Sequence, residues 1–278
     1  MAKKFKVLSK EEIAPQIKRM VIKAPLIAKK AKAGQFVILR VDEYGERFPL
    51  TLVDWNPNAG TITLIFQEVG VSTKKLGKIA PGAYIEDIVG PLGNPTEIDR
   101  YGHVAVIGGG VGTALIYPWV RSLKRVGNHV TTIIGARSAN LLLLEKELSE
   151  LSDEIYISTD DGTKGIKGFT SDVLKSLLEK GRKFDLVMAA GPVLMMKAVA
   201  DVTRPYKIKT IVSLNPIMVD GTGMCGSCRV TVGGKTRFAC VDGPEFDAHE
   251  VDFRELINRL RTYREEEQIA LQHLKDCQ

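Results

Sequence analysis

Four residues near the C-terminus follow the spacing Asp-x4-Cys-x2-Cys-x11-Cys, which constrains the local fold more than any other feature of the chain. They are Asp220, Cys225, Cys228 and Cys240. Side chains that bind one metal centre must converge, so the backbone between them has to wrap closely around it. A C-x4-C-x2-C loop with a distant fourth ligand is typical of a plant-type [2Fe–2S] site, although an aspartate holds the first ligand position here. The pattern therefore predicts a cluster that carries single electrons.

Three glycines lie among these ligands, at Gly221, Gly223 and Gly226. Glycine adopts positive φ easily and lets backbone N–H groups approach the cluster sulfurs. A carboxylate is a harder ligand than a thiolate, yet it carries the same charge and can bind iron. We therefore predict that Asp220 is a ligand and that it shifts the reduction potential of the cluster.

Three other interpretations of the cysteines are a structural zinc site, a disulfide and thiols buried in a core. Zinc sites usually pair two C-x2-C knuckles, whereas this chain has one. A redox-active C-x2-C pair is expected at a helix start in a βαβ unit, but this pair precedes a predicted hairpin at 229–238. The spacing thus favours the cluster, and Cys277 is predicted to be a free thiol.

The composition is that of an ordinary globular protein, with 44% hydrophobic and 26% charged residues among 278. This length suits two compact domains and a small appendage. No stretch reaches the roughly 20 apolar residues of a membrane span, and the N-terminus lacks the apolar segment of a signal peptide. We therefore expect a cytoplasmic protein that does not bind a membrane. We also expect no binding to nucleic acid, because the net charge of +6 is not gathered in a basic run.

Residues 1–100 predict an antiparallel barrel. Short apolar runs alternate with turns that contain glycine and proline, and many short strands at even spacing are typical of such barrels. The predicted strands are Ile17–Ile22, Gln35–Val41, Thr51–Val53, Thr61–Gln67 and Ala83–Val89.

Residues 101–214 predict a parallel sheet, because buried-type strands alternate with helical runs as in βαβ units. The predicted strands are His103–Ile107, His129–Ile134, Glu154–Ser158, Phe184–Ala189 and Lys209–Leu214. The predicted helices are 113–126, Asn140–Leu151, Thr170–Gly181 and Pro192–Tyr206.

Residues 215–278 are predicted to form a small third domain with the ligand loop, the hairpin and one charged helix from about 252 to 277. Apolar residues follow helical spacing along that helix, and a stripe of this kind is usually a packing surface. They are Phe253, Leu256, Ile257, Leu260 and Tyr263.

A glycine-rich turn in the middle domain points to a nucleotide. The run 108–112 stands where a strand is followed by a helix, so helix N–H groups there can bind a pyrophosphate, although a tight connection alone also favours glycine. Asp160 and Gly191 follow two later strands, at the edge where parallel sheets bind ligands. The acidic residue expected about 20 positions after a Rossmann motif is missing, because the run from Gly135 to Arg137 occupies that region.

Two motifs in the barrel suit a second nucleotide. Arg47 provides a guanidinium group for a pyrophosphate, and Thr51 can contact a flavin ring. Gly70, Ser72 and Thr73 offer close backbone approach and hydroxyl donors for a phosphate. Each motif would also fit a β-turn followed by a strand.

In their order along the chain, these motifs resemble the ferredoxin–NADP⁺ reductase-like superfamily over essentially the full length. Within it, the chain is similar to the electron-transfer subunits of the dihydroorotate dehydrogenase type. Those subunits have cysteine at the position of Asp220, and an aspartate there resembles the small subunits of NADH-dependent reduced ferredoxin:NADP⁺ oxidoreductases, also called sulfide dehydrogenases. The motifs are R-x-P-L-T at 47–51, G-x-S-T at 70–73, G-P-L-G at 90–93, G-G-G-x-G-x-A at 108–114, D-D-G at 160–162, A-G-P at 190–192 and the ligand loop.

The resemblance implies FAD in the barrel, NAD(H) on the middle domain and a [2Fe–2S] cluster as the outlet. Hydride would pass between NAD(H) and FAD, and single electrons would leave through the cluster to a larger iron–sulfur flavoprotein subunit, in an electron-bifurcating heterodimer. Asp160 and Asp161, if they face the adenosine ribose, would repel a 2′-phosphate and so favour NAD, whereas Arg137 argues for NADP. The residues carried over are Arg47, Pro49, Leu50 and Thr51 at the flavin, Gly70, Ser72 and Thr73 at its pyrophosphate, Gly109, Gly110, Gly112, Thr113, Asp160 and Gly191 at the nicotinamide nucleotide, and Asp220, Cys225, Cys228 and Cys240 at the cluster.

Two alternatives stay open on the sequence. The electron-transfer subunit of a dihydroorotate dehydrogenase shares the fold and the cofactors and differs in its catalytic partner. A regulatory nucleotide-binding module with a structural zinc would need no electron path. Iron and sulfide content separates the zinc module from the two redox proteins, and the identity of the partner separates those two from each other.

Overall fold

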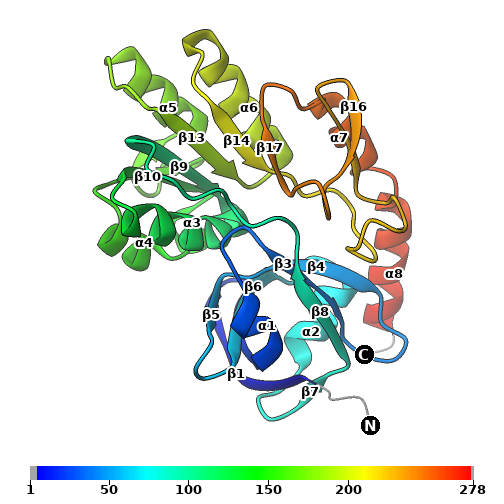
Figure 1. Ribbon diagram of the computed structural model, residues 1–278. Coiled ribbons are helices and arrows are strands. Elements are labelled where there is room, and N and C mark those ends of the chain that lie inside the picture. The colour runs from blue at the N-terminus through cyan, green and yellow to red at the C-terminus, as the bar shows by residue number, and fades with distance from the viewer. Residues whose placement is uncertain (1–4, 277–278) are drawn as a thin grey trace.

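An antiparallel β-barrel forms the first part of the computed structural model, which describes residues 5–276 (Figure 1). Apolar side chains on the inner faces of its strands make one core, which includes Met20, Leu39 and Phe66. The strands form a five-stranded and a three-stranded sheet, in the orders β5 (Asp54–Asn56), β6 (Thr61–Gln67), β2 (Ile17–Lys23), β1 (Phe5–Ala14), β7 (Tyr84–Ile85) and β4 (Arg47–Thr51), β3 (Phe36–Arg40), β8 (Asp87–Leu92).

The barrel differs from the sequence prediction in several places, and these include β5, which was missed, and the predicted strand Ala83–Val89, which is divided between β7 and β8. The strand predicted at Thr51–Val53 was placed too late, because β4 ends at Thr51; β4 lies at a sheet edge, where the missing N–H of Pro49 breaks no ladder. Strand β1 was not predicted. Two short helices, α1 (Pro25–Lys30) and α2 (Val71–Lys78), were also missed, since neither is long enough to show a helical period.

A seven-stranded sheet forms the centre of the molecule, and all its strand pairs are parallel except the last. The predicted parallel sheet is therefore confirmed. Its spatial order is β12 (Ile166–Lys167), β11 (Glu154–Thr159), β10 (His129–Ala136), β9 (His103–Gly109), β13 (Leu186–Ala190), β14 (Thr210–Ser213) and β17 (Glu245–Asp247).

Helices cover both faces of this sheet because its strands are apolar on both sides. On β9, Val104 and Val106 face one core while Ala105 and Ile107 face the other. The first core is completed by α3 (Thr113–Arg125) and α4 (Glu145–Leu151), and the second by α5 (Thr170–Glu179) and α6 (Val193–Thr203).

The helix predicted over Asn140–Leu151 is wrong in its first half. Ala139–Leu141 forms a single 3₁₀ turn, and Leu144 has a left-handed backbone with φ of 53°. A right-handed helix cannot run through such a residue, so α4 begins only at Glu145.

The C-terminal part of the chain returns to the central sheet. The predicted hairpin is present as β15 (Arg229–Val232) and β16 (Lys235–Phe238), joined by Gly233 and Gly234, which both have positive φ as a type I′ turn requires. Strand β17 then pairs antiparallel with β14, and the backbone N–H of Leu214 donates to the carbonyl of Pro244. The predicted boundary at 214/215 stays a prediction, but it divides chain segments that share one sheet.

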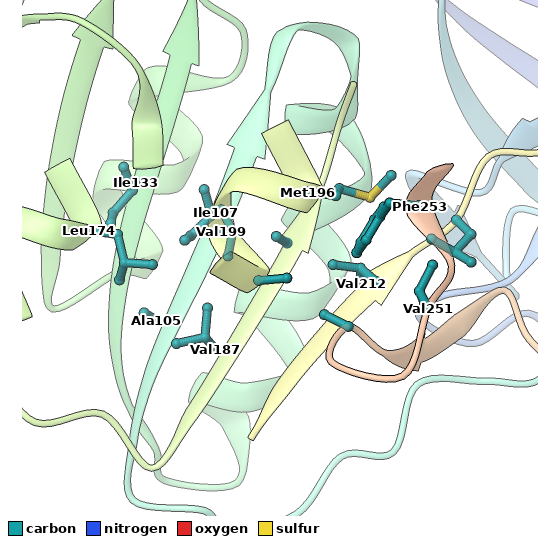
Figure 2. Close-up of a cluster of buried hydrophobic side chains, with 14 of the residues drawn as sticks. Ala105, Ile107, Ile133, Leu174, Val187, Met196, Val199, Val212, Val251 and Phe253 are labelled. Carbon is teal, nitrogen blue, oxygen red and sulfur yellow. The ribbon is translucent and has the colours of Figure 1, made fainter. Parts of the chain in front are cut away.

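Several residues between β17 and the end of α7 belong to the same core as the central sheet. Val251 and Phe253 pack with Val212 of β14 and Met196 of α6 in one buried cluster (Figure 2). The single helix predicted from 252 to 277 is wrong, because the chain forms α7 (Phe253–Arg259) and then α8 (Arg264–Asp276). Cys277 lies outside the described residues. Within residues 5–276, no helix has the length and apolar character that crossing a membrane requires.

Phe253→Ala tests whether the C-terminal segment and the central sheet fold as one unit. The phenyl ring is 6% exposed and lies in the shared core, so its loss should lower the free energy of unfolding by about 3–5 kcal/mol. Denaturant unfolding should show one transition that moves as a whole. Ile269→Ala on exposed α8 is the control, with an expected change within about 0.5 kcal/mol. A separate early transition in Phe253→Ala would contradict the shared core.

Candidate functional site

A cleft of about 880 Å³ lies between the barrel and the carboxyl edge of the central sheet. Its volume is in the range of small-molecule sites, about 300–1,000 Å³. Nine of the predicted nucleotide-binding residues line it, and they come from both sides. They are Pro49, Leu50, Thr51 and Thr73 of the barrel, and Gly109, Gly110, Gly112, Asp160 and Gly191 of the sheet.

The glycine-rich turn carries the chain from β9 into α3 along the cleft. A Cβ on Gly112 would overlap the carbonyl of Ala190 and the backbone of Gly191, and Gly110 has a φ of 55°. Glycine is therefore required where this turn passes the end of β13. Thr113 is buried at the first position of α3 and packs against Gly108 of the turn. The N-terminus of α3 is left facing the cleft, where its N–H groups suit an anion.

Two buried hydroxyl groups, near the C-terminal end of β11 and at the start of α5, are notable for their hydrogen bonding. Ser158 is 1% and Thr170 is 4% exposed, and the side-chain oxygen of each lacks a hydrogen bond among the described residues. Both residues line the cleft. Because a buried hydroxyl without a partner is costly, these two atoms fit a polar ligand that enters the cleft.

The two neighbouring aspartates after β11 have different environments. Asp161 accepts hydrogen bonds from the hydroxyl and N–H groups of Thr163, and these bonds lower its pKa. The carboxylate of Asp160 has no such partner in the described part of the chain, and it lines the cleft together with Arg137. Asp160 is thus the aspartate that remains available to a ligand.

The predicted flavin residues in the barrel do not all reach the cleft. Pro49, Leu50 and Thr51 line it from β4, but Arg47 is exposed and its guanidinium group lies 3.5 Å from the carboxylate of Asp87. At the second motif, α2 begins after Gly70, so three amides of its first turn can bind a phosphate. The remaining two side chains are already engaged, Thr73 with the backbone of Gly70 and Ser72 with Glu46.

The four predicted cluster ligands form two pairs. In the first pair, the carboxylate of Asp220 accepts hydrogen bonds from the N–H groups of Thr222 at 2.7 Å and Cys225 at 2.8 Å. These bonds and the thiol of Cys225 lower the pKa of Asp220. Asp220 is therefore held as an anion beside the exposed Cys225.

In the second pair, the buried thiol of Cys228 donates a hydrogen bond to the sulfur of Cys240 at 3.2 Å, and no disulfide joins them. Burial, and next the thiol of Cys228, raises the pKa of Cys240 to about 12. Without a cation, this pair would resist ionisation, whereas a metal held between the two sulfurs would stabilise both thiolates.

Two pairs of anionic ligands fit a two-iron cluster, in which each iron takes two protein ligands, better than a single ion. Within residues 5–276, no three or more His, Cys, Asp or Glu side chains surround one point where a lone metal would bind. The glycines predicted to shape the loop have positive φ, and a Cβ on Gly221 would overlap Ile38 and Leu92 of the barrel. The ligand loop is therefore seated on the barrel.

The cleft and the buried cysteine pair share two neighbouring residues. Phe36 of β3 and Met218 line the cleft, and both also pack in the buried cluster that contains Cys228 and Cys240. Sequence reasoning missed these two residues, as well as Gly34 and Thr170, because no motif contains them. Only the unpaired hydroxyl groups give a signal, and burial in the folded chain is needed to see it.

Comparison with known proteins supports this site. The iron–sulfur cluster binding domain of dihydroorotate dehydrogenase B matches residues 215–252, which include all four ligands. A Thermotoga maritima protein described as a dihydroorotate dehydrogenase B (NAD(+)), electron transfer subunit homolog is 47% identical over 264 residues, which cover 95% of this chain and 93% of the relative.

Two solved structures extend the comparison. A chain of the NADH-dependent reduced ferredoxin-NADP oxidoreductase, a structure that gives insight into flavin-based electron bifurcation, superposes with a TM-score of 0.93 at 45% identity and 99% coverage of both chains. Phthalate dioxygenase reductase has a TM-score of 0.62 at 18% identity, covering 83% of this chain and 86% of that chain, and so shows the fold alone.

The barrel, the nucleotide-type sheet and the ligand loop define an electron-transfer subunit with the ferredoxin reductase-like fold. The predicted fold class is confirmed. More specifically, the chain belongs to the family of dihydroorotate dehydrogenase B electron-transfer subunits and their homologues, and the resemblance to the ferredoxin-NADP oxidoreductase holds over its full length.

Substitutions at Asp220 test whether its carboxylate is a ligand. Asp220→Cys should retain a cluster with an altered reduction potential, because a thiolate replaces a harder ligand of equal charge. Asp220→Ala should lose or weaken the cluster. Iron and sulfide content with an electron paramagnetic resonance spectrum measures both.

Asp242→Ala is the matched control for Asp220, since its carboxylate also binds a backbone N–H in this segment, that of Phe238. It should keep the cluster and its spectrum. Unchanged spectra in both Asp220 variants would show that Asp220 is not a ligand.

Proposed function

We propose that this chain exchanges hydride between NAD(H) and FAD and passes single electrons through a [2Fe–2S] cluster to a partner subunit, within an electron-bifurcating NADH-dependent ferredoxin:NADP⁺ oxidoreductase. One observation carries the proposal: Phe36 and Met218 belong both to the wall of the cleft and to the packing around the buried cysteine pair. A ligand in the cleft and a cluster in the loop would therefore be close neighbours. FAD, when bound, supplies the conversion between an electron pair and single electrons.

The central sheet would bind the nicotinamide nucleotide. The N-terminus of α3 and the turn with Gly110 and Gly112 would hold its pyrophosphate, and the hydroxyl groups of Ser158 and Thr170 would gain a partner from it. Gly191 keeps the end of β13 free of a side chain, because a Cβ there would crowd the carbonyl of Gly109 at 3.0 Å and its φ of 157° is one that other residues rarely adopt. No acid or base is required for hydride transfer itself, so these residues bind and orient.

The barrel would bind the flavin. Pro49, Leu50 and Thr51 lie on the cleft side of β4, and the first turn of α2 would receive a phosphate from its backbone N–H groups. Arg47 would have to leave Asp87 to reach the flavin pyrophosphate, a change that a weak contact at 3.5 Å permits.

The cluster segment, residues 215–278, would form the outlet for electrons. Asp220 and the exposed Cys225 stand on the outer side, while Cys228 and Cys240 face the core, so electrons would enter from the buried pair and leave from the exposed one. Residues 1–100, 101–214 and 215–278 would then serve as the flavin, nucleotide and cluster parts. A reducing cytoplasm suits the three free thiols.

The Asp220 position favours an oxidoreductase of the ferredoxin:NADP⁺ type, and the likeness to that enzyme over the whole chain supports it. The electron-transfer subunit of a dihydroorotate dehydrogenase is the second candidate, favoured by the description of the 47% identical relative. Both proteins would use the same cleft and loop. The partner decides between them.

Affinity purification of the chain from its own cells tests the partner. We expect a larger iron–sulfur flavoprotein to co-purify, and the complex to reduce NADP⁺ with NADH and reduced ferredoxin together. A dihydroorotate-oxidising subunit in its place would establish the second candidate and overturn our choice.

Asp160→Ser tests the preference for NAD. Removing the unpartnered carboxylate should raise the ratio of NADPH to NADH use, measured as kcat/KM, by about tenfold, which corresponds to about 1.4 kcal/mol of lost repulsion. Asp161→Ser is the control, because the carboxylate of Asp161 is already bound by Thr163. A larger change from Asp161→Ser than from Asp160→Ser would place the ribose elsewhere.

A further inference from the structure

The carboxyl group of Glu245 lies where the three parts of the chain meet. Its Oε1 atom accepts hydrogen bonds from the hydroxyl of Thr96 at 2.6 Å and from the indole N–H of Trp119 at 3.0 Å. Thr96 belongs to the connection between barrel and sheet, Trp119 to α3, and Glu245 to β17. One atom therefore joins segments that are far apart in the sequence.

The same contact reaches the wall of the cleft. A Cβ on Gly34 would overlap both the Thr96 hydroxyl and Oε1 of Glu245, so the barrel backbone touches this group directly. Gly34 lines the cleft, and the carbonyl of Ala33 accepts a hydrogen bond from the N–H of Thr96 at 2.8 Å. Any displacement of Glu245 would thus move the backbone that forms the cleft.

Both donors to Glu245 are neutral, and burial raises the pKa of its carboxyl group to about 7. The titratable group that faces it is Tyr101, whose pKa is raised by burial and then by Glu97, Asp99 and Glu245. None of these groups supplies a positive charge.

Three cations on the neighbouring elements have other partners. On α3, Arg121 pairs with Asp54 and Lys124 with Asp153. At the start of β14, Lys209 lies over the Tyr101 ring at 5.8 Å. On β17 itself, Asp247 accepts a hydrogen bond from the N–H of His249. A proton is therefore the means by which Glu245 can be neutralised in place.

We propose that Glu245 is a positioning residue that locks the barrel, the central sheet and the cluster segment together, and that proton uptake at its carboxyl group tightens this lock. When the lock is closed the carboxyl group is partly buried, which favours the neutral acid; when it opens, water stabilises the carboxylate. Protonation of Glu245 therefore stabilises the closed lock. This stabilisation is complete below the ordinary pKa of a glutamic acid, about 4.3, and is lost as the pH rises through about 7.

The lock matters for electron transfer if the proposed function holds, because it keeps the cleft and the cluster segment at a fixed separation. Its existence does not depend on that function. A spectroscopic measurement on Trp119 can therefore test it without any redox reaction.

Nuclear magnetic resonance of the indole N–H groups, in the flavin- and cluster-loaded protein, is the test. The chain has two tryptophans, so Trp55→Phe assigns the signal of Trp119. From about pH 5.5 to 8.5, this signal should titrate with a midpoint near 7, and its hydrogen exchange should accelerate beyond that expected from pH alone. Glu245→Gln, a neutral group of the same shape, should abolish the titration and keep exchange slow.

Glu245→Ala should remove one of the two acceptors of the Trp119 indole N–H at all pH values, so its exchange should become about tenfold faster, as expected for the loss of one hydrogen bond. Glu250→Gln, at an exposed glutamate of the same segment, is the matched control and should titrate like the unaltered chain. If Glu245→Ala fails to fold, Thr96→Val is the second variant: it removes a donor to Glu245 together with the other acceptor of the indole N–H, so the exchange of the Trp119 signal should accelerate.

A second readout is the rate of NADH-driven cluster reduction, which should decline above about pH 7 in the unaltered chain but not in Glu245→Gln. A Trp119 signal that does not titrate, or that titrates equally in Glu245→Gln, would overturn the lock. Failure of NADH to reduce the protein, with the titration intact, would instead overturn the proposed function alone.

Discussion

The antiparallel pairing of β17 with β14 determines how the working parts of this chain are placed. It makes the end of the cluster segment the last strand of the central sheet, and it brings Val251 and Phe253 into the core beneath that sheet. Because the carboxyl edge of the same sheet faces the cleft, the ligand loop must lie beside the cleft as well. The packing of Phe36 and Met218 around the buried cysteines depends on this pairing, and so does the contact at Glu245.

Much of the fold could be predicted because its patterns are local. Strands with two apolar faces, such as β9, indicate a sheet covered on both sides, and Gly233-Gly234 predicts a hairpin turn. The errors arose where a local signal was too short or was broken by one residue. Leu144 interrupts a helical pattern through its backbone alone, and the exposed turn between α7 and α8 contains no glycine or proline that would mark it.

The candidate site likewise has residues that the sequence predicts and residues that it does not. The cluster ligands follow one another closely, so their spacing alone predicted a centre, and the structure pairs Asp220 with Cys225 and Cys228 with Cys240. Contacts between segments that are distant along the chain leave no pattern in the sequence. Glu245 is one of many glutamates in the sequence, and only the neutral donors at Thr96 and Trp119 distinguish it. Arg47 shows the opposite case, a residue with a convincing motif whose side chain lies on Asp87.

The hydrogen bond from Leu214 to Pro244 gives the cluster segment the character of an insertion. The chain leaves the sheet after β14 and returns beside the same strand, so the intervening residues 215–243 begin and end at adjacent points. Segments with neighbouring ends can be added to or removed from a sheet edge without altering the strands behind them. Here both ends of the segment are fixed at the edge of the sheet, so the metal centre is held by the same sheet that carries the nucleotide site.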